Sequence, residues 1–297
     1  MSFILTTDTS CDEFKNVLDS LNIPWIPLTF TINGETFDDN FTDDAEYQAF
    51  YAKLEGGAMP TTSQITPLSH EEFFKKVLTE QKSDTIIHLS LSGGLSDTAN
   101  AAKKGAADCM TRNPKAKIYC VDTQLATQGH NILLYEALKM RDKGLSAKEA
   151  YEKIEKLKAR VHAWFMVDSL YHLKRGGRVS GVSAAIGTIL NIKPVLIVNH
   201  EGKLKVVKKL KGMLKAINFF MEIIKEYSTN DTNEFYIVQA NAYKNAELLK
   251  VHIEKEYPSA RIKIGWLGPI IGTHCGGGML GLVFIGRDRK EIKIKNE

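Results

Sequence analysis

The chain has 297 residues, of which 43% are hydrophobic and 25% charged, and its net charge is only +4. These values are ordinary for a soluble globular protein, and the charge is too small to indicate nucleic-acid binding by itself. No apolar run approaches the roughly 20 residues that span a bilayer, and the first residues lack the basic region of a signal peptide. The four cysteines are scattered, which favours a reduced, metal-free, cytoplasmic protein.

Apolar runs in the first half of the chain predict strands. They cover residues 3–9, 25–32, 85–92 and 117–123. Periodic apolar residues between the runs predict helices, such as one from Ser96 with Ala99, Ala102 and Ala106 on one face. Alternation of strands and helices favours an α/β fold with a mostly parallel sheet.

Three short patterns predict where helices begin. A serine three residues before a glutamate has the spacing of a capping box, in which each side chain bonds the other residue's backbone N–H. The pairs are Ser10 with Glu13, Ser69 with Glu72, and Ser146 with Glu149. Each pair is predicted to open a helix, and Asn33-Gly34 predicts a turn after the second strand.

The second half of the chain is richer in strands. We expect them at residues 163–169, 193–199, 203–210, 234–240, 261–267 and 278–286. A helix is predicted over 213–227, and "NHEGK" at 199–203 predicts a hairpin turn. The change of pattern predicts two α/β domains, residues 1–161 and 162–297.

Three loops combine polar and small residues in ways that suit either binding or plain structure. Residues 60–67 carry hydroxyl groups between two prolines, which also describes a solvated loop. Residues 89–98 join a strand end, two glycines and a helix N-terminus, a geometry that suits either an anion site or a tight turn. Residues 173–181 set basic side chains around two glycines, as in a phosphate site or a basic surface turn.

A fourth loop, "GPIIGTHCGGG" at 268–278, places His274 beside Cys275. Zinc needs three or four ligands, and a cysteine nucleophile needs a separate base and an orienting group. We therefore expect neither a metal nor covalent catalysis here. His274 is predicted to lie at a strand mouth as a hydrogen-bonding group, and Cys275 to be a small buried apolar residue.

These four loops, in this order, resemble the DegV family of bacterial fatty-acid-binding proteins. The matching segments are "TTDTS", "TTSQ", "SGGLSDTA", "VDT", "FMVDSLYHLKRGGRVS", "IKPVL" and "GPIIGTHCGGG", which together span nearly the whole chain. The resemblance implies a DegV-like fold in which two α/β domains enclose one long-chain fatty acid. It also implies no cofactor and no catalytic residue.

The resemblance also implies a set of carboxylate-binding residues. In that family the carboxylate meets a threonine, serine hydroxyls and a nearby histidine, and the matching positions here are Thr62, Ser92, Ser96 and His274. The family's second serine falls on Gly93, so Ser92, Ser96 and the Gly93 backbone N–H all remain candidates. The family's arginine falls on Lys211, which keeps the charge but loses the bidentate geometry.

The function implied by the resemblance is a non-catalytic carrier. It would bury the acyl chain in an apolar tunnel and present the acid to a separate ATP-dependent fatty acid kinase that forms an acyl phosphate. Each buried methylene is worth about 0.8 kcal/mol, so a long chain needs only a small polar mouth. Arg178 and Lys211 are then predicted to dock the kinase or to stabilise the phosphate.

Two other classes of protein are weighed against the carrier. A phosphotransferase or hydrolase lacks support, since Walker, GxSxG and metal signatures are missing. A lipid-responsive regulatory protein could use the lysines of 203–215 on nucleic acid or membrane, although a solvated hairpin accounts for most of them. We expect no nucleic-acid partner and at most a transient contact with an anionic membrane.

Overall fold

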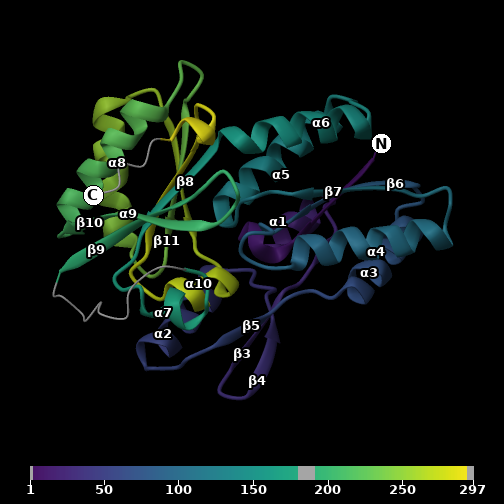
Figure 1. Ribbon diagram of the computed structural model, residues 1–297, viewed down its shortest axis with the longest axis horizontal. Coiled ribbons are helices and arrows are strands. Elements are labelled where there is room, and N and C mark those ends of the chain that lie inside the picture. The colour runs from purple at the N-terminus through teal and green to yellow at the C-terminus, as the bar shows by residue number, and fades with distance from the viewer. Residues whose placement is uncertain (1–2, 180–190, 293–297) are drawn as a thin grey trace.

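Three β-sheets organise the computed structural model, which describes residues 3–179 and 191–292 (Figure 1). The first sheet is entirely parallel, in the order β2-β1-β6-β7. Its strands are β1 (Ile4–Asp8), β2 (Trp25–Ile26), β6 (Thr85–Ser90) and β7 (Lys117–Asp122). The predicted parallel sheet is thereby confirmed.

Helices cover both faces of this parallel sheet, as the buried runs in its strands require. α3 (Pro67–Glu80) and α4 (Thr98–Arg112) pack on one face, and α5 (Thr127–Asp142) and α6 (Ala147–Leu157) on the other (Figure 1). Neighbouring residues of one strand accordingly enter different cores. Ile86 packs among α3 and α4 residues, whereas Ile87 joins the cluster that contains Leu133 of α5.

The second sheet is mixed, in the order β10-β9-β8-β13-β11-β12, and β11–β12 is its parallel pair. Its strands are β8 (Val161–Met166), β9 (Ile192–Val198), β10 (Leu204–Lys211), β11 (Glu234–Gln239), β12 (Arg261–Trp266) and β13 (Leu280–Ile285). α8 (Met213–Tyr227) and α9 (Tyr243–Glu256) cover one face. α8 has the bounds predicted from the sequence.

A small antiparallel sheet lies below the junction of the two larger sheets in Figure 1, and the remaining helices complete the structure. The sheet has the order β4-β3-β5. Its strands are β3 (Thr29–Ile32), β4 (Glu35–Asp38) and β5 (Thr61–Ser63). The remaining helices are η1 (Thr9–Cys11), α1 (Lys15–Ser20), α2 (Asp44–Glu55), η2 (Lys158–Arg160), α7 (Tyr171–Arg175), α10 (Pro269–Cys275) and η3 (Arg289–Glu291).

The predicted single strand over 25–32 is wrong. Residues 25–26 pair with β1, whereas residues 29–32 leave for the small sheet. Pro27 lies between them and has no N–H for a ladder, and the Leu28 N–H donates instead to Thr9 Oγ1 at 3.0 Å. The turn at Asn33-Gly34 is confirmed, since both residues have positive φ and join β3 to β4.

One of the three predicted capping boxes is confirmed. Ser146 and Glu149 bond each other's backbone N–H groups at the start of α6. Ser10 instead lies inside η1 and donates to Asp8 Oδ1, so α1 begins later, at Lys15. Thr66 caps α3, and Ser69 supplies the N–H that this cap accepts.

The division at residues 161 and 162 remains a prediction. β8 begins at Val161, but one hydrophobic cluster includes both Leu133 and Phe165 and therefore continues across the boundary.

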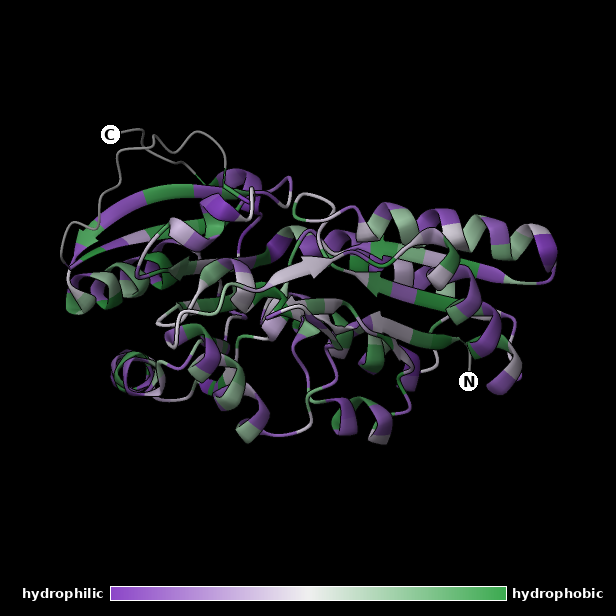
Figure 2. Ribbon diagram, turned by 90° about the horizontal axis from the view of Figure 1, so that it is seen from below, coloured by the Kyte–Doolittle hydropathy of each residue, from purple (hydrophilic) through white to green (hydrophobic). Residues whose placement is uncertain are grey.

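Figure 2 shows hydrophobic residues along the strands and mixed faces along the helices. No helix in the described ranges combines the length and hydropathy of a membrane span.

Candidate functional site

An apolar cavity of about 430 Å³ lies against the second sheet. Its floor comes from adjacent strands, with Leu204 of β10, Val198 of β9, Ala163 and Phe165 of β8, Gly281 and Val283 of β13, and Val238 of β11. Four strand spacings of about 4.8 Å separate β10 from β11, so the floor is roughly 19 Å long. The cavity is therefore long enough for an extended chain molecule.

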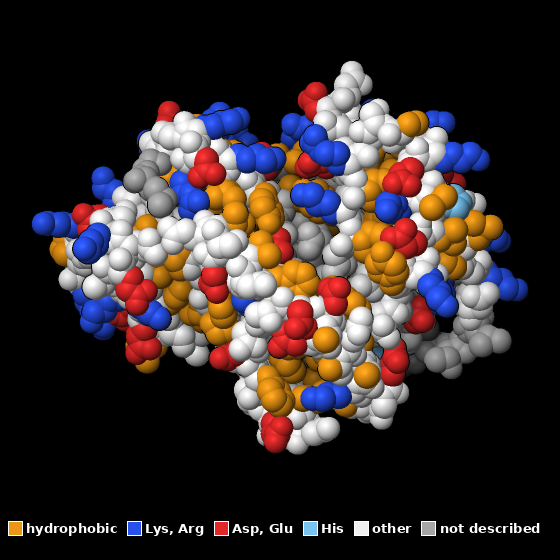
Figure 3. Space-filling view, turned by 180° about the vertical axis from the view of Figure 1, so that it is seen from behind, with side chains coloured by type: hydrophobic (Ala, Val, Ile, Leu, Met, Phe, Trp, Pro, Cys, Tyr) orange, Lys and Arg blue, Asp and Glu red, His pale blue; other side chains and the backbone are white. Residues whose placement is uncertain are grey.

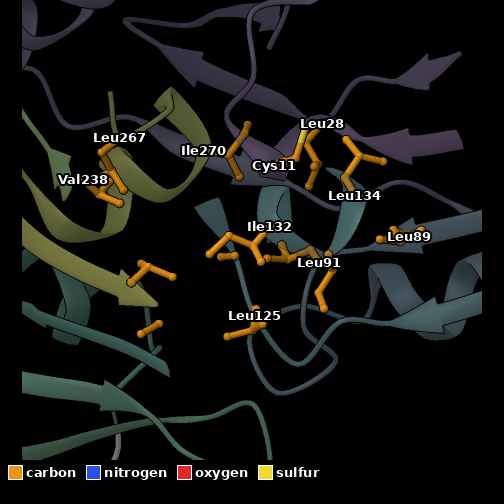
Figure 4. Packing of buried hydrophobic residues seen from close by; sticks show 14 of the residues in the cluster. Cys11, Leu28, Leu89, Leu91, Leu125, Ile132, Leu134, Val238, Leu267 and Ile270 are labelled. Atoms are coloured by element: carbon orange, nitrogen blue, oxygen red, sulfur yellow. The ribbon is translucent and has the colours of Figure 1, made fainter. Parts of the chain in front are cut away.

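The opposite wall of the cavity comes from loops and from α10. Leu28, Leu91 and Ala126 approach from the first half of the chain, and Ile270 from the second. Figure 4 shows Leu28, Leu91, Val238 and Ile270 in one packed cluster drawn from these separate elements. The space is thus enclosed by both halves of the chain, which the sequence resemblance implied.

Polar side chains gather where this wall meets β5. Thr62 on β5 and His274 in the last turn of α10 both line the cavity, with Thr62 Oγ1 2.9 Å from His274 Nε2. Ser96 and Arg178 line it as well. Two residues 212 positions apart in sequence are therefore in direct contact, and their role in one carboxylate site stays a prediction.

His274 lies on a helix, so the predicted strand mouth is wrong. Pro269 opens α10, and the left-handed Gly276 ends it. Gly176 lies so close that a Cβ there would come within 2.2 Å of His274 Nδ1. Only glycine allows this approach between α7 and α10.

The His274 imidazole is neutral at pH 7. Burial, together with smaller contributions from the positive charges of Arg178 and Arg175, lowers its pKa to about 4. Its Nδ1 is buried and has no hydrogen-bond partner among the described residues. His274 can thus exchange a hydrogen bond with a ligand or with Thr62, but it does not supply a positive charge.

The basic turn after α7 is attached to the other loops of the site. Arg178 Nε donates to the Leu95 carbonyl at 3.2 Å, and Arg178 Nη1 donates to the Gly176 carbonyl. Arg175 Nη2 donates to the Pro60 carbonyl at 2.8 Å, just before β5. Among the described residues that line the cavity, Arg178 is the charged one. Ser180 and Gly181, at the end of the predicted 173–181 loop, lie outside the described residues.

A second, polar pocket of about 420 Å³ adjoins the cavity. The two share Leu95, Ser96, Arg178 and Leu204. The remaining lining of the polar pocket includes the exposed Gly93, Gly177 and Lys203. We call this pocket the vestibule, because it leads from the polar end of the cavity to solvent.

The structure separates the three candidates in the 92–96 segment. Ser92 is fully buried, and its Oγ donates to the Gly202 carbonyl at 2.8 Å while accepting from Gly94 N–H. The Gly93 N–H donates to Asp122 Oδ1 at 3.0 Å. Neither residue lines the cavity, whereas Ser96 does, with its Oγ 2.9 Å from Thr98 Oγ1.

Asp122 is a contributor that the sequence analysis missed. Its Oδ1 accepts from the N–H groups of Gly93 and Gln124 and so holds the turn beside the vestibule. A Cβ at Gly93 would come within 2.6 Å of Asp122 Oδ2. The serine that the family carries at this position would therefore require Asp122 to move, which gives glycine a steric reason here.

Lys211 is not brought to the site. It ends β10, seven residues beyond Leu204, which at about 3.4 Å per residue places it roughly 24 Å away along the strand. The structure thus brings together Thr62, Ser96, Arg178 and His274 and leaves Lys211 apart. The cavity-floor positions were missed too, although alternation along β8 and β13 could have singled out Ala163, Phe165, Gly281 and Val283.

Cys275 lines the cavity as a neutral thiol. Burial raises its pKa to about 12, with a smaller contribution in the same direction from Asp12. A protonated thiol is a weak nucleophile. Within residues 3–179 and 191–292, no three His, Cys, Asp or Glu residues form a group that could hold a metal ion.

Comparison with known proteins places this geometry in a family. The model described as "Uncharacterised protein, DegV family" matches residues 2–287. A DegV domain-containing protein of Clostridium perfringens is 36% identical over 97% of this chain and 99% of its own length.

Solved structures have the same fold. The fatty acid binding DegV family protein of Streptococcus agalactiae is 26% identical, covers 97% of this chain and 100% of its own, and has a TM-score of 0.83. The fatty acid kinase B3 protein of Streptococcus pneumoniae, loaded with linoleic acid, is 20% identical, with coverage of 96% and 99% and a TM-score of 0.81. On the strength of the family match over nearly its whole length, this chain belongs to the DegV family.

Proposed function

We propose that this protein binds one long-chain fatty acid, with the acyl chain in the cavity and the carboxylate at Thr62, Ser96 and His274. The observation that carries the proposal is the long apolar floor with polar side chains at the end that adjoins the vestibule. An extended hydrocarbon advances about 1.25 Å per carbon, so a floor of roughly 19 Å corresponds to about fifteen carbons.

The free energy of binding would then come mainly from burial of the acyl chain, with polar groups needed only at the carboxylate. About fifteen buried methylenes at about 0.8 kcal/mol each give an upper limit near ~12 kcal/mol before ordering costs. A carboxylate leaving water requires convergent donors, which the hydroxyls of Thr62 and Ser96 supply. The Arg178 guanidinium also lines this end of the cavity, but it donates to the Leu95 and Gly176 carbonyls. The names of relatives such as the Streptococcus agalactiae protein support the same ligand class.

Native mass spectrometry followed by lipid extraction tests the proposal. The purified protein should carry one equivalent of a fatty acid, and the delipidated protein should take up an added acid of similar length. A protein that neither retains nor rebinds any fatty acid would contradict it. Extraction of an unrelated apolar ligand would redirect the assignment to that ligand.

We further propose that the bound acid is presented to a separate fatty acid kinase through the vestibule. The vestibule opens beside the carboxylate end, and its lining contains two basic residues, Arg178 and Lys203, and one acidic residue, Asp97. Positive charge there would steer an acidic partner and stabilise phosphate charge as it develops. On the face seen in Figure 3, by contrast, acidic and basic side chains are interspersed. The kinase B3 protein that shares the fold supports this role through its name.

Arg178→Ala tests the presentation step. Fatty-acid affinity should stay near wild type, whereas acyl-phosphate formation with a fatty acid kinase and ATP should slow, with a defect that depends on salt. Lys211→Ala is the control, since that lysine is far from the vestibule along β10. If binding, phosphorylation and thermal stability all fall together in Arg178→Ala, the residue is structural. If neither binding nor phosphorylation changes, the kinase approaches another face.

A further inference from the structure

Gly281 occupies an unusual position in the cavity floor. It lies inside β13, opposite Phe165 of β8 on one side and Val238 of β11 on the other. A glycine inside a strand loses much backbone freedom on folding and offers no side chain to pack. Its presence in the middle of a six-stranded sheet therefore requires a local reason.

Backbone conformation does not supply that reason. The φ of Gly281 lies outside the left-handed region, so an L-residue could adopt this conformation. Close packing supplies only a small part of it, because an added Cβ would first meet Met279 Cε at 3.1 Å, and this flexible side chain would have to move by a few tenths of an ångström. At Gly286, just beyond β13, the same atom would come within 2.3 Å of the Tyr227 carbonyl oxygen.

Because glycine has no side chain, position 281 leaves more space in the cavity than any other residue would. Alternate residues of β13 face opposite sides of the sheet. Leu280 and Leu282 pack in the cluster of α8 and α9, whereas Gly281 and Val283 line the cavity. A side chain at 281 would point into the space assigned to the acyl chain.

The position of β13 decides which part of the chain would be affected. Leu204 lines both the cavity and the vestibule, so the β10 side is the polar end. β13 is three strand spacings from β10, about 14 Å, or roughly eleven carbons of an extended chain. Gly281 thus lies beneath the distal part of a bound acid.

We propose that Gly281 determines how long an acyl chain the cavity accepts, an inference that rests on the proposed fatty-acid binding. Ala163 on β8 is the matched control, because it lines the same floor one strand nearer the polar end. Every long chain passes Ala163, whereas only the carbons beyond about the eleventh reach Gly281.

The test measures the affinity of delipidated wild type, Gly281→Val and Ala163→Val for saturated acids of about 10 to 18 carbons, by competition with a fluorescent fatty acid. In Gly281→Val, the affinity for the longest acid relative to the shortest should fall at least about tenfold from the wild-type ratio. Ala163→Val should weaken all lengths by similar factors. Each ratio comes from one folded preparation, so lost stability does not imitate the effect.

Equal weakening of all lengths in Gly281→Val, or an unchanged ratio, would overturn the inference. If the valine variant does not fold, Gly281→Ala adds a single methyl and should shift the ratio in the same direction. A wild type that binds none of these acids would overturn the proposed function and this inference together. A wild type that binds them, with an unchanged ratio in the variants, overturns the inference alone.

Discussion

The two faces of β13 differ in what they pack against, although both are apolar. Leu280, Leu282 and Phe284 are fully buried in the cluster formed with α8 and α9. On the other face Gly281 and Val283 border a cavity of about 430 Å³. On β13, the residues that face the cavity are smaller than those that face α8 and α9, although both sets are apolar. The size of the side chains, rather than their hydrophobicity, therefore distinguishes the cavity wall from the packed core. β8 shows this contrast only in part: Met166 enters the packed cluster and Ala163 lines the cavity, but the larger Trp164 and Phe165 line it as well.

The largest expected effect tests this contrast directly. Leu282→Ala should lower the free energy of unfolding by about 2–5 kcal/mol, because it leaves a void in a close-packed cluster. Val283→Ala, on the cavity face, should cost at most ~1.6 kcal/mol, the transfer of two methyl groups at ~0.8 kcal/mol each. Urea denaturation of the ligand-free proteins measures both, and equal losses would show that the cavity face is packed like the core.

The next effect concerns the polar end of the container. Thr62→Ala removes a hydroxyl that contacts His274 and lines the cavity. Loss of one hydrogen bond to a buried carboxylate costs about 1.5–3 kcal/mol, so fatty-acid affinity should fall roughly ten- to a hundredfold. Thr61→Ala, at the exposed preceding position of β5, is the control and should bind normally. Unchanged affinity in Thr62→Ala, with the fold intact by circular dichroism, would remove Thr62 from the site.

The smallest expected effect is the pH dependence of stability at the same end. Burial lowers the pKa of His274 to about 4, below its unfolded value near 6.5, so its neutral form is favoured by folding. This contribution is complete above about pH 6.5 and is lost as the pH falls toward 4. Between pH 7 and 5 it should amount to about 1–2 kcal/mol.

Comparison with His274→Gln isolates that contribution, because other buried histidines titrate in both proteins. The free energy of unfolding of the ligand-free wild type should fall more steeply from pH 7 to 5 than that of the variant. Parallel pH profiles would show that His274 has an ordinary pKa, and with it a more open polar end than the structure has.

Local sequence patterns predicted the elements that depend on burying one face. The apolar residues of 213–227 gave a helix with the observed bounds, and the run at 117–123 matches β7. The pattern was misleading where a tertiary contact competes with a local one. Ser10 bonds Asp8 in place of Glu13, and Leu28 donates to Thr9 at the point where residues 25–32 divide between two sheets.

The candidate site was predictable only in part. Resemblance to the family indicated Thr62, Ser96 and His274, which the structure brings to one cavity. It did not show that Ser92 is engaged by Gly202, because that carbonyl belongs to a hairpin turn 110 residues further along the chain. Nor did it show that Lys211 lies at the far end of β10, since position along a strand acquires a distance from the site only in the folded sheet.

The sequence by itself determined the family, the parallel first sheet and the residue types available for a carboxylate. These follow from motifs and from apolar periodicity, which are local properties of the chain. Only the tertiary structure decided which apolar positions enclose empty space and which polar groups already have partners. Both faces of β13 carry apolar residues at alternate positions, so the sequence pattern does not tell which face borders a cavity. Whether a hydroxyl such as that of Ser92 already has a hydrogen-bond partner depends on residues that are remote in sequence.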